Sequence, residues 1–264
     1  MSIPRVLTIA GSDSGGGAGI QADLKTFTAL GVYGMSAITS ITVQNTVGVF
    51  GVMDLPESMV YQQIKVVVED IGVDAVKTGM LSHAGIVETV ARAIKDFKLE
   101  KVVVDPVMRA KSGDPLLKSS DEKAVKELLI PLTSIITPNI PEAQALTGIE
   151  IRDVQDMERA CRLLYSLGAG SVLLKGGHME GNTLVDVFYD GSNFRHLVYE
   201  RINTKNTHGT GCTLASAIAS YLAKGLSLEE SVLKAREYVQ GAIRRSLNLG
   251  KGHGPLNHMW VYMR

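Results

Sequence analysis

The sequence predicts an α/β fold of three layers, in which helices cover both faces of a central, mostly parallel sheet. Short segments that are apolar throughout alternate with longer segments of helical periodicity, and this alternation is typical of parallel strands buried on both faces. The expected strands are Val6–Ala10, Met35–Val43, Ala75–Thr78, Val102–Asp105, Ile135–Thr137 and Val172–Lys175. The expected helices are Ile20–Leu30, Met59–Asp70, Ala84–Phe97, Glu122–Leu129, Pro141–Thr147, Val154–Leu167, Thr213–Lys224 and Leu228–Arg245.

Turn and capping signals support these boundaries. Ser227 and Glu230 have the spacing of a capping box at the start of the last helix. Leu184–Tyr189 and His196–Arg201, joined by a polar Asp-Gly-Ser-Asn segment, predict a β-hairpin. Phe50–Asp54 is a candidate for one more short strand.

Length and composition indicate one domain. The chain has 264 residues, of which 45% are hydrophobic, so it can bury one sizeable core. No Ser/Pro-rich linker, charge block or repeat divides it, and we therefore expect a single domain over residues 1–264.

Charge and cysteine usage exclude several classes of protein. The 27 basic residues are balanced by 27 acidic ones, so neither a nucleic acid nor an acidic membrane is an expected partner. Cys161 and Cys212 form no disulfide framework or metal-ligand cluster, which favours a reducing, intracellular location. No apolar run approaches the ~18–20 residues that span a bilayer. We expect a cytoplasmic protein that acts on a small molecule.

Polar or glycine-rich clusters follow each of the six expected parallel strands. Ligands of open parallel sheets bind beyond the carboxyl ends of the strands, so these clusters are expected to converge on one edge. The clusters are Gly11–Gly19, Gln44 and Asn45, Gly79 and Met80, Asp105–Ser112, Asn139 with Glu142, and Lys175–His178.

The glycine-rich segment Gly11–Gly19 allows three interpretations. It could be a flexible turn, a dinucleotide loop, or a place where the backbone approaches a small ligand closely, since glycine has no Cβ. The spacing fits GxGxxG poorly, and the chain contains no Walker-type GxxxxGK[ST] motif. Asp23 follows in the first part of the next helix, where it could face a pocket or simply compensate the helix dipole.

The segment Asn206–Cys212 carries the strongest signal for chemistry. Its Gly-Thr-Gly sequence precedes a helix built from small and apolar residues, and backbone N–H groups at such a helix start bind anions. Cys212 lies in the first turn, a position that lowers the pKa of a thiol. The alternative is a glycine turn with a buried structural cysteine. His208 is interpreted as a loop residue that forms hydrogen bonds, and not as a metal ligand.

Three further charged residues suit a phosphate site. Lys175 ends an apolar strand and precedes two glycines, as a phosphate-binding lysine would. Glu142 and Asp105 could help to hold Mg²⁺, which takes only one or two protein carboxylates and keeps most of its waters. Dipole compensation for Glu142 and strand termination for Asp105 are the alternatives.

Several motifs match a known family. They are Thr8–Lys25, Thr42–Thr46, Lys77–Leu81, Asp105–Met108 with Lys111–Gly113, Thr137–Asn139, Leu174–His178 and Asn206–Cys212. With these motifs the sequence resembles the hydroxymethylpyrimidine/phosphomethylpyrimidine kinases of bacterial thiamine biosynthesis, within the ribokinase superfamily. The resemblance covers nearly the whole chain. It implies a ribokinase-like fold and phosphorylation, with ATP and Mg²⁺, of 4-amino-5-hydroxymethyl-2-methylpyrimidine and of its monophosphate.

The resemblance also implies roles for individual residues. The residues expected to line the substrate pocket are Gly11, Asp23, Gln44, Met80 and Val107. Those expected at the nucleotide are Asn139, Lys175, Thr207, Gly209 and Gly211, with Glu142 and Asp105 near the metal, through water. Gly209, Thr210 and Gly211 would form the anion hole, and Cys212 would be the base, where most sugar kinases of the superfamily have Asp. Arg109 is atypical, and the sequence gives no account of it.

Other functions remain open at this point. A pyridoxal kinase would share the architecture and the cysteine. A non-catalytic sensor of a vitamer or nucleotide is a second alternative, against which Lys175 and Cys212 argue. A dinucleotide-dependent oxidoreductase is less favoured, because the sequence lacks a clean fingerprint. By analogy with the family we expect a homodimer.

Overall fold

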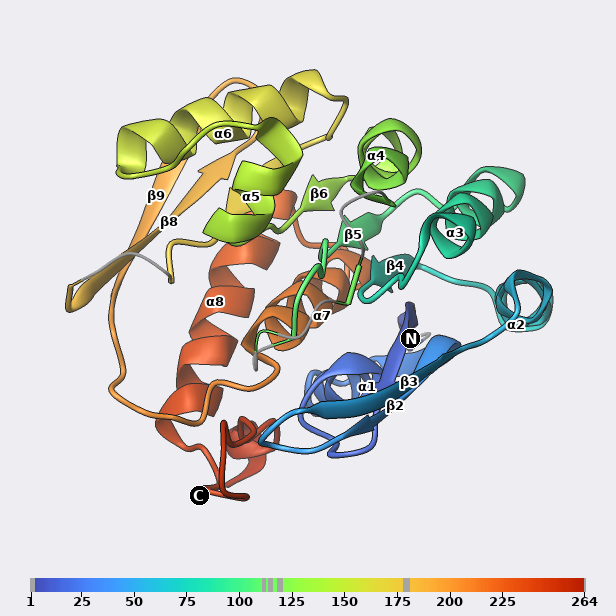
Figure 1. The fold of residues 1–264 in the computed structure, drawn as a ribbon, viewed down its shortest axis with the longest axis horizontal. Coiled ribbons are helices and arrows are strands. Elements are labelled where there is room, and N and C mark those ends of the chain that lie inside the picture. Colours follow the sequence, from blue (N-terminus) through green and yellow to red (C-terminus); the bar gives the residue numbers. More distant parts are fainter. Residues whose placement is uncertain (1–2, 111–112, 114–115, 118–120, 178–180, 264) are drawn as a thin grey trace.

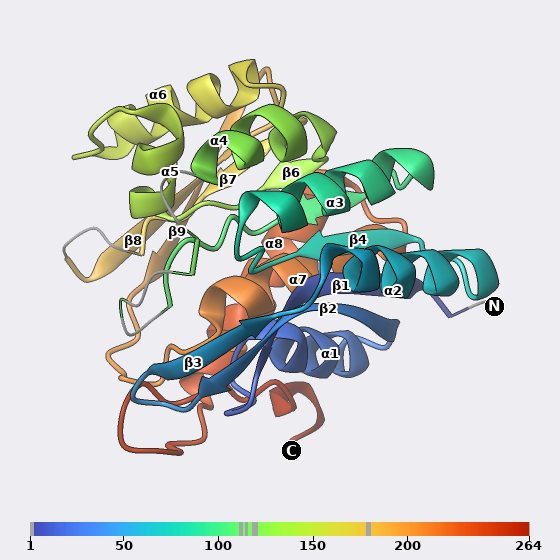
Figure 2. The same ribbon diagram turned by 45° about the vertical axis from the view of Figure 1, so that its right-hand side comes forward.

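The computed structural model has one nine-stranded sheet between two layers of helices (Figures 1 and 2). It describes residues 3–110, 113, 116–117, 121–177 and 181–263. The strands are β1 (Arg5–Asp13), β2 (Tyr33–Gln44), β3 (Val49–Asp54), β4 (Ala75–Thr78), β5 (Val102–Val104), β6 (Ile135–Ile136), β7 (Val172–Leu174), β8 (Thr183–Tyr189) and β9 (Phe194–Glu200). The helices are α1 (Gly19–Ala29), α2 (Glu57–Asp70), α3 (Ala84–Asp96), α4 (Glu122–Ala124), α5 (Ile140–Thr147), α6 (Val154–Ser166), α7 (Thr210–Ala223) and α8 (Leu228–Arg244).

The sheet is mostly parallel, as predicted. Its order is β3-β2-β1-β4-β5-β6-β7-β8-β9, and the β3, β8 and β9 pairings are antiparallel. The chain winds outward from β1 in both directions, so β1 and β4 flank the point where the strand order reverses. Ligands of such sheets bind at this point, beyond the carboxyl ends of the strands.

Strand residues alternate between two cores, which explains their apolar runs. In β5, Val102 and Val104 join the core under α2, α3, α5 and α6, whereas Val103 joins the core under α1, α7 and α8. All three are fully buried. Both faces of the central strands are therefore covered, as the absence of polar alternation predicted. Figure 2 shows the helices lying on both sides of the sheet.

Most predicted elements are confirmed, including the β8–β9 hairpin, the short strand β3 and the Ser227–Glu230 capping box. Two differ. The predicted helix Glu122–Leu129 is α-helical only over Glu122–Ala124 and continues as a π-helix over Val125–Leu129. Strand β1 extends to Asp13, so Gly11 lies in a strand and not in the following turn. Within the described part of the chain, no helix combines the length and apolar character needed to cross a membrane.

Candidate active site

A cavity of about 990 Å³ lies at the carboxyl edge of the sheet. Its lining comes from the ends of β1 and β2, the segments after β4 to β7, and the start of α7. The sequence-predicted site residues that it brings together are Gly11, Gln44, Met80, Asp105, Val107, Asn139, Glu142, Lys175, Thr207, Gly209, Thr210, Gly211 and Cys212. Asp23 is not among the lining residues. The six clusters therefore do converge on one edge.

One end of the cavity is lined by Gly11, Gln44 and Met80. A Cβ on Gly11 would lie 3.0 Å from the Met80 sulfur, so any larger residue would push into the space beside it. The half-buried Gln44 follows β2, and its side-chain oxygen accepts a hydrogen bond from the Thr42 hydroxyl at 3.0 Å. The carboxamide of Gln44 gives this end of the cavity a group that can both donate and accept hydrogen bonds.

The glycine-rich loop is held by Asp13. One oxygen of this carboxylate accepts from Gly15 N, and the other accepts from Gly17 N, Ala18 N and the His208 ring at 2.8 Å. Burial alone would raise the pKa of Asp13, but the hydrogen bonds from His208 and the backbone outweigh it and lower the pKa. The loop is thus an ordered structure. His208 forms hydrogen bonds, as predicted.

The same loop packs against the start of α7. Gly209 has φ +81°, and a Cβ there would lie 1.8 Å from the Gly17 carbonyl oxygen, so both the conformation and the contact require glycine. The Thr210 hydroxyl donates to the Thr207 carbonyl at 2.8 Å and fixes the turn before the helix. First-turn N–H groups of an α-helix have no intrahelical acceptor. The start of α7 therefore presents an anion-binding site to the cavity.

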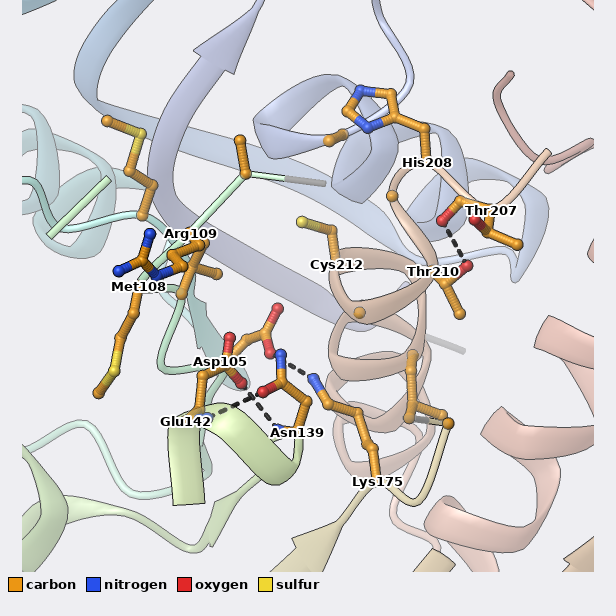
Figure 3. A pocket seen from close by; sticks show the side chains of 18 of the residues that line it. Asp105, Met108, Arg109, Asn139, Glu142, Lys175, Thr207, His208, Thr210 and Cys212 are labelled. Carbon is orange, nitrogen blue, oxygen red and sulfur yellow. Dashed lines mark hydrogen bonds and ion pairs between the residues drawn. The ribbon is translucent and has the colours of Figure 1, made fainter. Parts of the chain in front are cut away.

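Lys175, Asp105 and Glu142 form a second charged group (Figure 3). Lys175 follows β7 and donates to Asp105 at 2.9 Å, and the two side chains are 13% and 3% exposed. Asn139 and Glu142 form a reciprocal capping box at the start of α5. Burial raises the pKa of Glu142 to about 7, the Lys175 charge opposes the rise, and the Asp105 charge adds to it. The group holds two carboxylates for one lysine.

Asp23 occupies a different place from the predicted one. It is fully buried and lies beneath the cavity, where it pairs with Lys77 at 2.9 Å and accepts from the Thr8 and Ser216 hydroxyls. In this structure Asp23 lies below the cavity lining, and its partners are on β1, β4 and α7. Lys77 contributes to the cavity floor, and the sequence analysis gave it no role. A lysine inside the short and completely buried strand β4 was the available signal.

The predicted effect on the Cys212 thiol is also wrong. Cys212 lies in the first turn of α7 as expected, and it lines the cavity. However, burial raises the pKa of the thiol to about 11, although the Lys77 charge and the Gly19 N–H lower it in part. The helix terminus does not compensate for desolvation. At neutral pH the resting side chain is therefore almost entirely the thiol.

The far wall of the cavity was not anticipated from sequence. It is formed by β8, β9 and α8, and it includes Leu184, Tyr199, Arg236 and Gln240. Arg236 pairs with the buried Asp186 and lies 4.3 Å from the centroid of the Tyr199 ring. These residues lie on three elements outside the Asn206–Cys212 motif and have no local pattern that marks them.

Arg109 also lines the cavity, and its guanidinium donates to the Gly113 carbonyl at 3.2 Å. This contact lies within its own segment and gives no reason for an arginine at this position.

The fold and the site define a small-molecule kinase of the ribokinase-like class. The phosphomethylpyrimidine kinase family model matches residues 13–257, and this chain belongs to that family. The hydroxymethylpyrimidine/phosphomethylpyrimidine kinase of Bacillus subtilis is 51% identical over 98% of this chain and 96% of the relative. The bifunctional thiamine biosynthesis protein ThiED of Geobacter sulfurreducens is 52% identical over 96% of this chain, which spans about half (52%) of that longer protein.

The structure is also similar to the solved ADP complex of Bacillus subtilis pyridoxal kinase. The TM-score is 0.93, with 41% sequence identity and full coverage of both chains. The similarity confirms the predicted ribokinase-like fold and supports ATP as the phosphoryl donor.

Proposed function

We propose that the cavity transfers the γ-phosphoryl group of ATP to the hydroxyl of 4-amino-5-hydroxymethyl-2-methylpyrimidine, and then a second phosphoryl group to the monophosphate. The observation that carries this proposal is one continuous cavity. At one end of this cavity lies the carboxamide of Gln44. At the other end lies an anion site, which is formed by the start of α7 together with Lys175. Family membership supports the same two acceptors.

The reaction exchanges one P–O bond for another. The substrate hydroxyl oxygen forms a bond to the γ-phosphorus, and the bond from that phosphorus to the β–γ bridging oxygen breaks with its electron pair going to ADP. Phosphoryl transfer passes through a loose transition state, so positioning and charge stabilisation supply most of the rate. Lys175 would leave Asp105 for the transferring phosphate, and the N–H groups of Gly211 and Cys212 would hold its oxygens.

Cys212 is the proposed acceptor of the hydroxyl proton. It lies at the junction of the two parts of the cavity, and the proton moves late in a loose transition state. Because its pKa is about 11, the active form is a minor thiolate species. A base with this pKa is strong enough to accept a proton from an alcohol once the oxygen bonds to phosphorus.

The carboxylates near Lys175 fit a magnesium ion. Glu142 is buried near Asp105 and Lys175, and burial, with a smaller contribution from the Asp105 charge, raises the pKa of Glu142 although the Lys175 charge lowers it. Mg²⁺ is usually held by one or two carboxylates together with substrate phosphates. Asp105 and Glu142 would hold the ion through water, and a bound Mg²⁺ supplies charge neutralisation on the phosphates.

Gln44 is proposed to read the pyrimidine. The substrate has an exocyclic amine next to a ring nitrogen, a donor beside an acceptor, and a carboxamide offers the complementary pair. A pyridoxal kinase remains the second candidate, and the structural similarity to such an enzyme favours it. Pyridoxal has a ring hydroxyl in place of the amine and nitrogen, so it would leave part of the carboxamide unpaired.

We further propose a homodimer in the cytoplasm. The edge formed by β2 and β3 exposes Val43, Phe50 and Met53 by 63%, 67% and 59%. Such a run of apolar side chains on an edge strand suits a second copy of the chain. A thiol that must accept protons suits a reducing compartment. Light scattering after gel filtration measures the mass, and Phe50→Glu should convert a dimer to a monomer.

The direct test is a side-by-side assay. Purified protein with ATP and Mg²⁺ is given the pyrimidine, its monophosphate or pyridoxal, and ADP formation and product mass are followed. We expect the pyrimidine and its monophosphate to have the higher kcat/KM. A higher kcat/KM for pyridoxal would favour the second candidate, and ADP formation with none of the three would contradict both.

A further inference from the structure

Lys77 and Asp23 form an ion pair that is completely enclosed by protein. Both side chains have no exposed area, and Lys77 Nζ lies 2.9 Å from Asp23 Oδ2. The same oxygen accepts from the Thr8 hydroxyl at 2.7 Å, and Oδ1 accepts from the Ser216 hydroxyl at 2.6 Å. Asp23 is thereby fixed from β1, β4 and α7 at once.

Such a pair is not explained by stability. Removing two charges from water has an energetic penalty that their attraction often fails to offset, and apolar residues of similar volume are commonly as stable. The pair lies on the sheet face that packs against α1 and α7, where the strand residues Val6 and Ala75 are buried in a hydrophobic core. A function that requires the charge is therefore a better account of it.

Lys77 and Cys212 lie near the same part of α7. Ser216, which binds Asp23, lies one helical turn after Cys212 on α7, so the pair lies below the same face of the helix. Gly79 leaves room for the ammonium, because a Cβ there would be 2.8 Å from Lys77 Nζ. One of the three N–H groups of Lys77 Nζ donates to Asp23. Among the described residues, Asp23 is the acceptor recorded for this ammonium. Lys77 and Cys212 both line the cavity.

Other charged groups act on the same thiol. Asp23 and Asp105 oppose the thiolate, and Lys77 favours it. Lys175 also interacts with Cys212, but it is paired with Asp105 and is needed by the phosphates. Lys77 is paired with Asp23 instead and is not one of the residues proposed to bind the phosphates.

We propose that Lys77 is a positioning residue for phosphoryl transfer: its ammonium, held by Asp23 beneath the cavity floor, stabilises the Cys212 thiolate that takes the hydroxyl proton. The inference rests on the proposed role of Cys212. It gives the buried pair a chemical purpose, since a desolvated thiol without a fixed cation would be deprotonated too rarely to act. The raised pKa of Lys77 shows that the ammonium keeps its charge despite burial.

The test measures the thiolate without requiring turnover. The rate of Cys212 alkylation by iodoacetamide, a neutral reagent, rises with the thiolate fraction at a fixed pH, and a plot of the rate against pH gives the pKa of the thiol in each variant. Cys161 is fully buried and does not interfere, and peptide mass spectrometry identifies the modified residue. An opposite charge nearby shifts a pKa by about 1–3 units, so Lys77→Met should slow alkylation by about tenfold or more. The kcat should fall in parallel, while the KM for ATP changes little.

Ser216→Ala is the matched control, because it removes a hydrogen bond from the same network and keeps both charges. Its alkylation rate should stay within about twofold of the wild type. If Lys77→Met does not fold, the double variant Lys77→Met/Asp23→Asn removes the pair without leaving a lone buried charge. Its rate should also fall, by a smaller factor, since a charge that opposes the thiolate is lost as well.

A wild-type alkylation rate in either folded Lys77 variant would overturn the proposal. An equal loss in Ser216→Ala would also overturn it, because the effect would then come from packing. Full activity of Cys212→Ala would instead contradict the proposed role of Cys212. The alkylation rates would still decide whether Lys77 acts on the thiol.

Discussion

Two lysines lie at the same edge of the sheet, each beside an aspartate at 2.9 Å, and their environments differ. Lys77 lies within β4, and both partners of its pair are completely buried. Lys175 follows β7, and its side chain is 13% exposed at the cavity wall. Asp23 also accepts two hydroxyl hydrogen bonds, whereas among the described residues the Asp105 carboxylate has, besides Lys175, a long contact of 3.4 Å to Thr137.

The difference separates a permanent charge from an exchangeable one. A pair saturated by neighbouring hydrogen bonds keeps its geometry, and ligand binding has no reason to open it. The lysine of a pair at a cavity wall can leave its carboxylate for a phosphate, because the phosphate replaces the negative charge that the lysine gives up. A Cβ on Gly211 would lie only 3.2 Å from Lys175 Nζ, so the lysine already lies against the anion site. The following predictions test this contrast.

The largest effect is expected for Cys212→Ala. Loss of a general base lowers kcat by about 10²–10⁴-fold, with the lower part of this range expected for a loose transition state. In the wild type the pKa of the thiol is about 11, so the thiolate fraction and kcat should rise with pH from neutrality toward that value. Cys212→Ala should lose this rise. Steady-state kinetics across pH measure both the loss of kcat and the loss of its pH dependence. Wild-type turnover in Cys212→Ala would mean that Cys212 lines the cavity and takes no part in proton transfer. Cys161→Ala, at a buried cysteine outside the cavity, should change stability and leave the pH profile intact.

Lys175→Ala should lower kcat/KM by about 10²–10³-fold, because a preorganised charge at the transferring phosphate is lost. The variant also leaves Asp105 buried without its partner, so some loss of stability is expected. Circular dichroism and kinetics on the folded fraction separate the two effects. Lys65→Ala, which removes an exposed lysine from α2, is the control and should change neither. Normal turnover in folded Lys175→Ala would contradict the exchange.

The contrast also shows what the sequence could predict. The layers and the convergence of the polar clusters on one edge of the sheet follow from local patterns, and Gly209 and Lys175 were placed at the cavity from such patterns. Asp23 and Lys77 were missed as a pair because they are 54 positions apart and meet only through the packing of α1 on β4. The pKa of Cys212 was misjudged because desolvation depends on tertiary packing, whereas the helix start is visible locally. The wall at Arg236 and Tyr199 has the same nonlocal origin.

Gln44→Leu tests whether the end of the cavity lined by Gln44 selects the acceptor that is phosphorylated. An unpaired buried amide group costs about 1–3 kcal/mol, and sites that bind a polar substrate group discriminate against analogues without it. We expect kcat/KM for the pyrimidine to fall at least about tenfold, and that for pyridoxal to change little or to improve. Thr42→Val is the control, since it removes the hydroxyl that binds the Gln44 oxygen and keeps the carboxamide. Equal losses on both acceptors would mean that Gln44 supports its loop only.

The smallest effect concerns Glu142, and its sign distinguishes a ligand site from a structural cap. The pKa of Glu142 is raised in the folded protein from 4.5 to about 7. Between pH 4.5 and pH 7 the folded protein therefore holds a proton on Glu142 that the unfolded chain has released. Stability therefore falls as pH rises through this window, and the whole penalty is present above it. Glu142→Gln keeps an oxygen that accepts from Asn139 N and removes the charge. It should be more stable than the wild type at pH 8, on the order of 1 kcal/mol, and similar near pH 4.5, while its activity with Mg²⁺ falls.

Glu230→Gln provides the matched comparison, because Glu230 forms the same kind of capping box with Ser227 on the surface. Hydrogen bonds from Ser227 lower the pKa of Glu230, so its charge stabilises the fold above its unfolded pKa, and that contribution is lost as pH falls through the folded value. Urea unfolding at pH 4.5 and pH 8 measures the free energy of unfolding of each variant. At pH 8 we expect Glu142→Gln to be more stable than the wild type and Glu230→Gln to be less stable. Destabilisation by both variants would mean that Glu142 is only a helix cap. A gain confined to Glu142→Gln would identify a carboxylate kept at the expense of stability, as a residue that awaits a cation beside Lys175 would be.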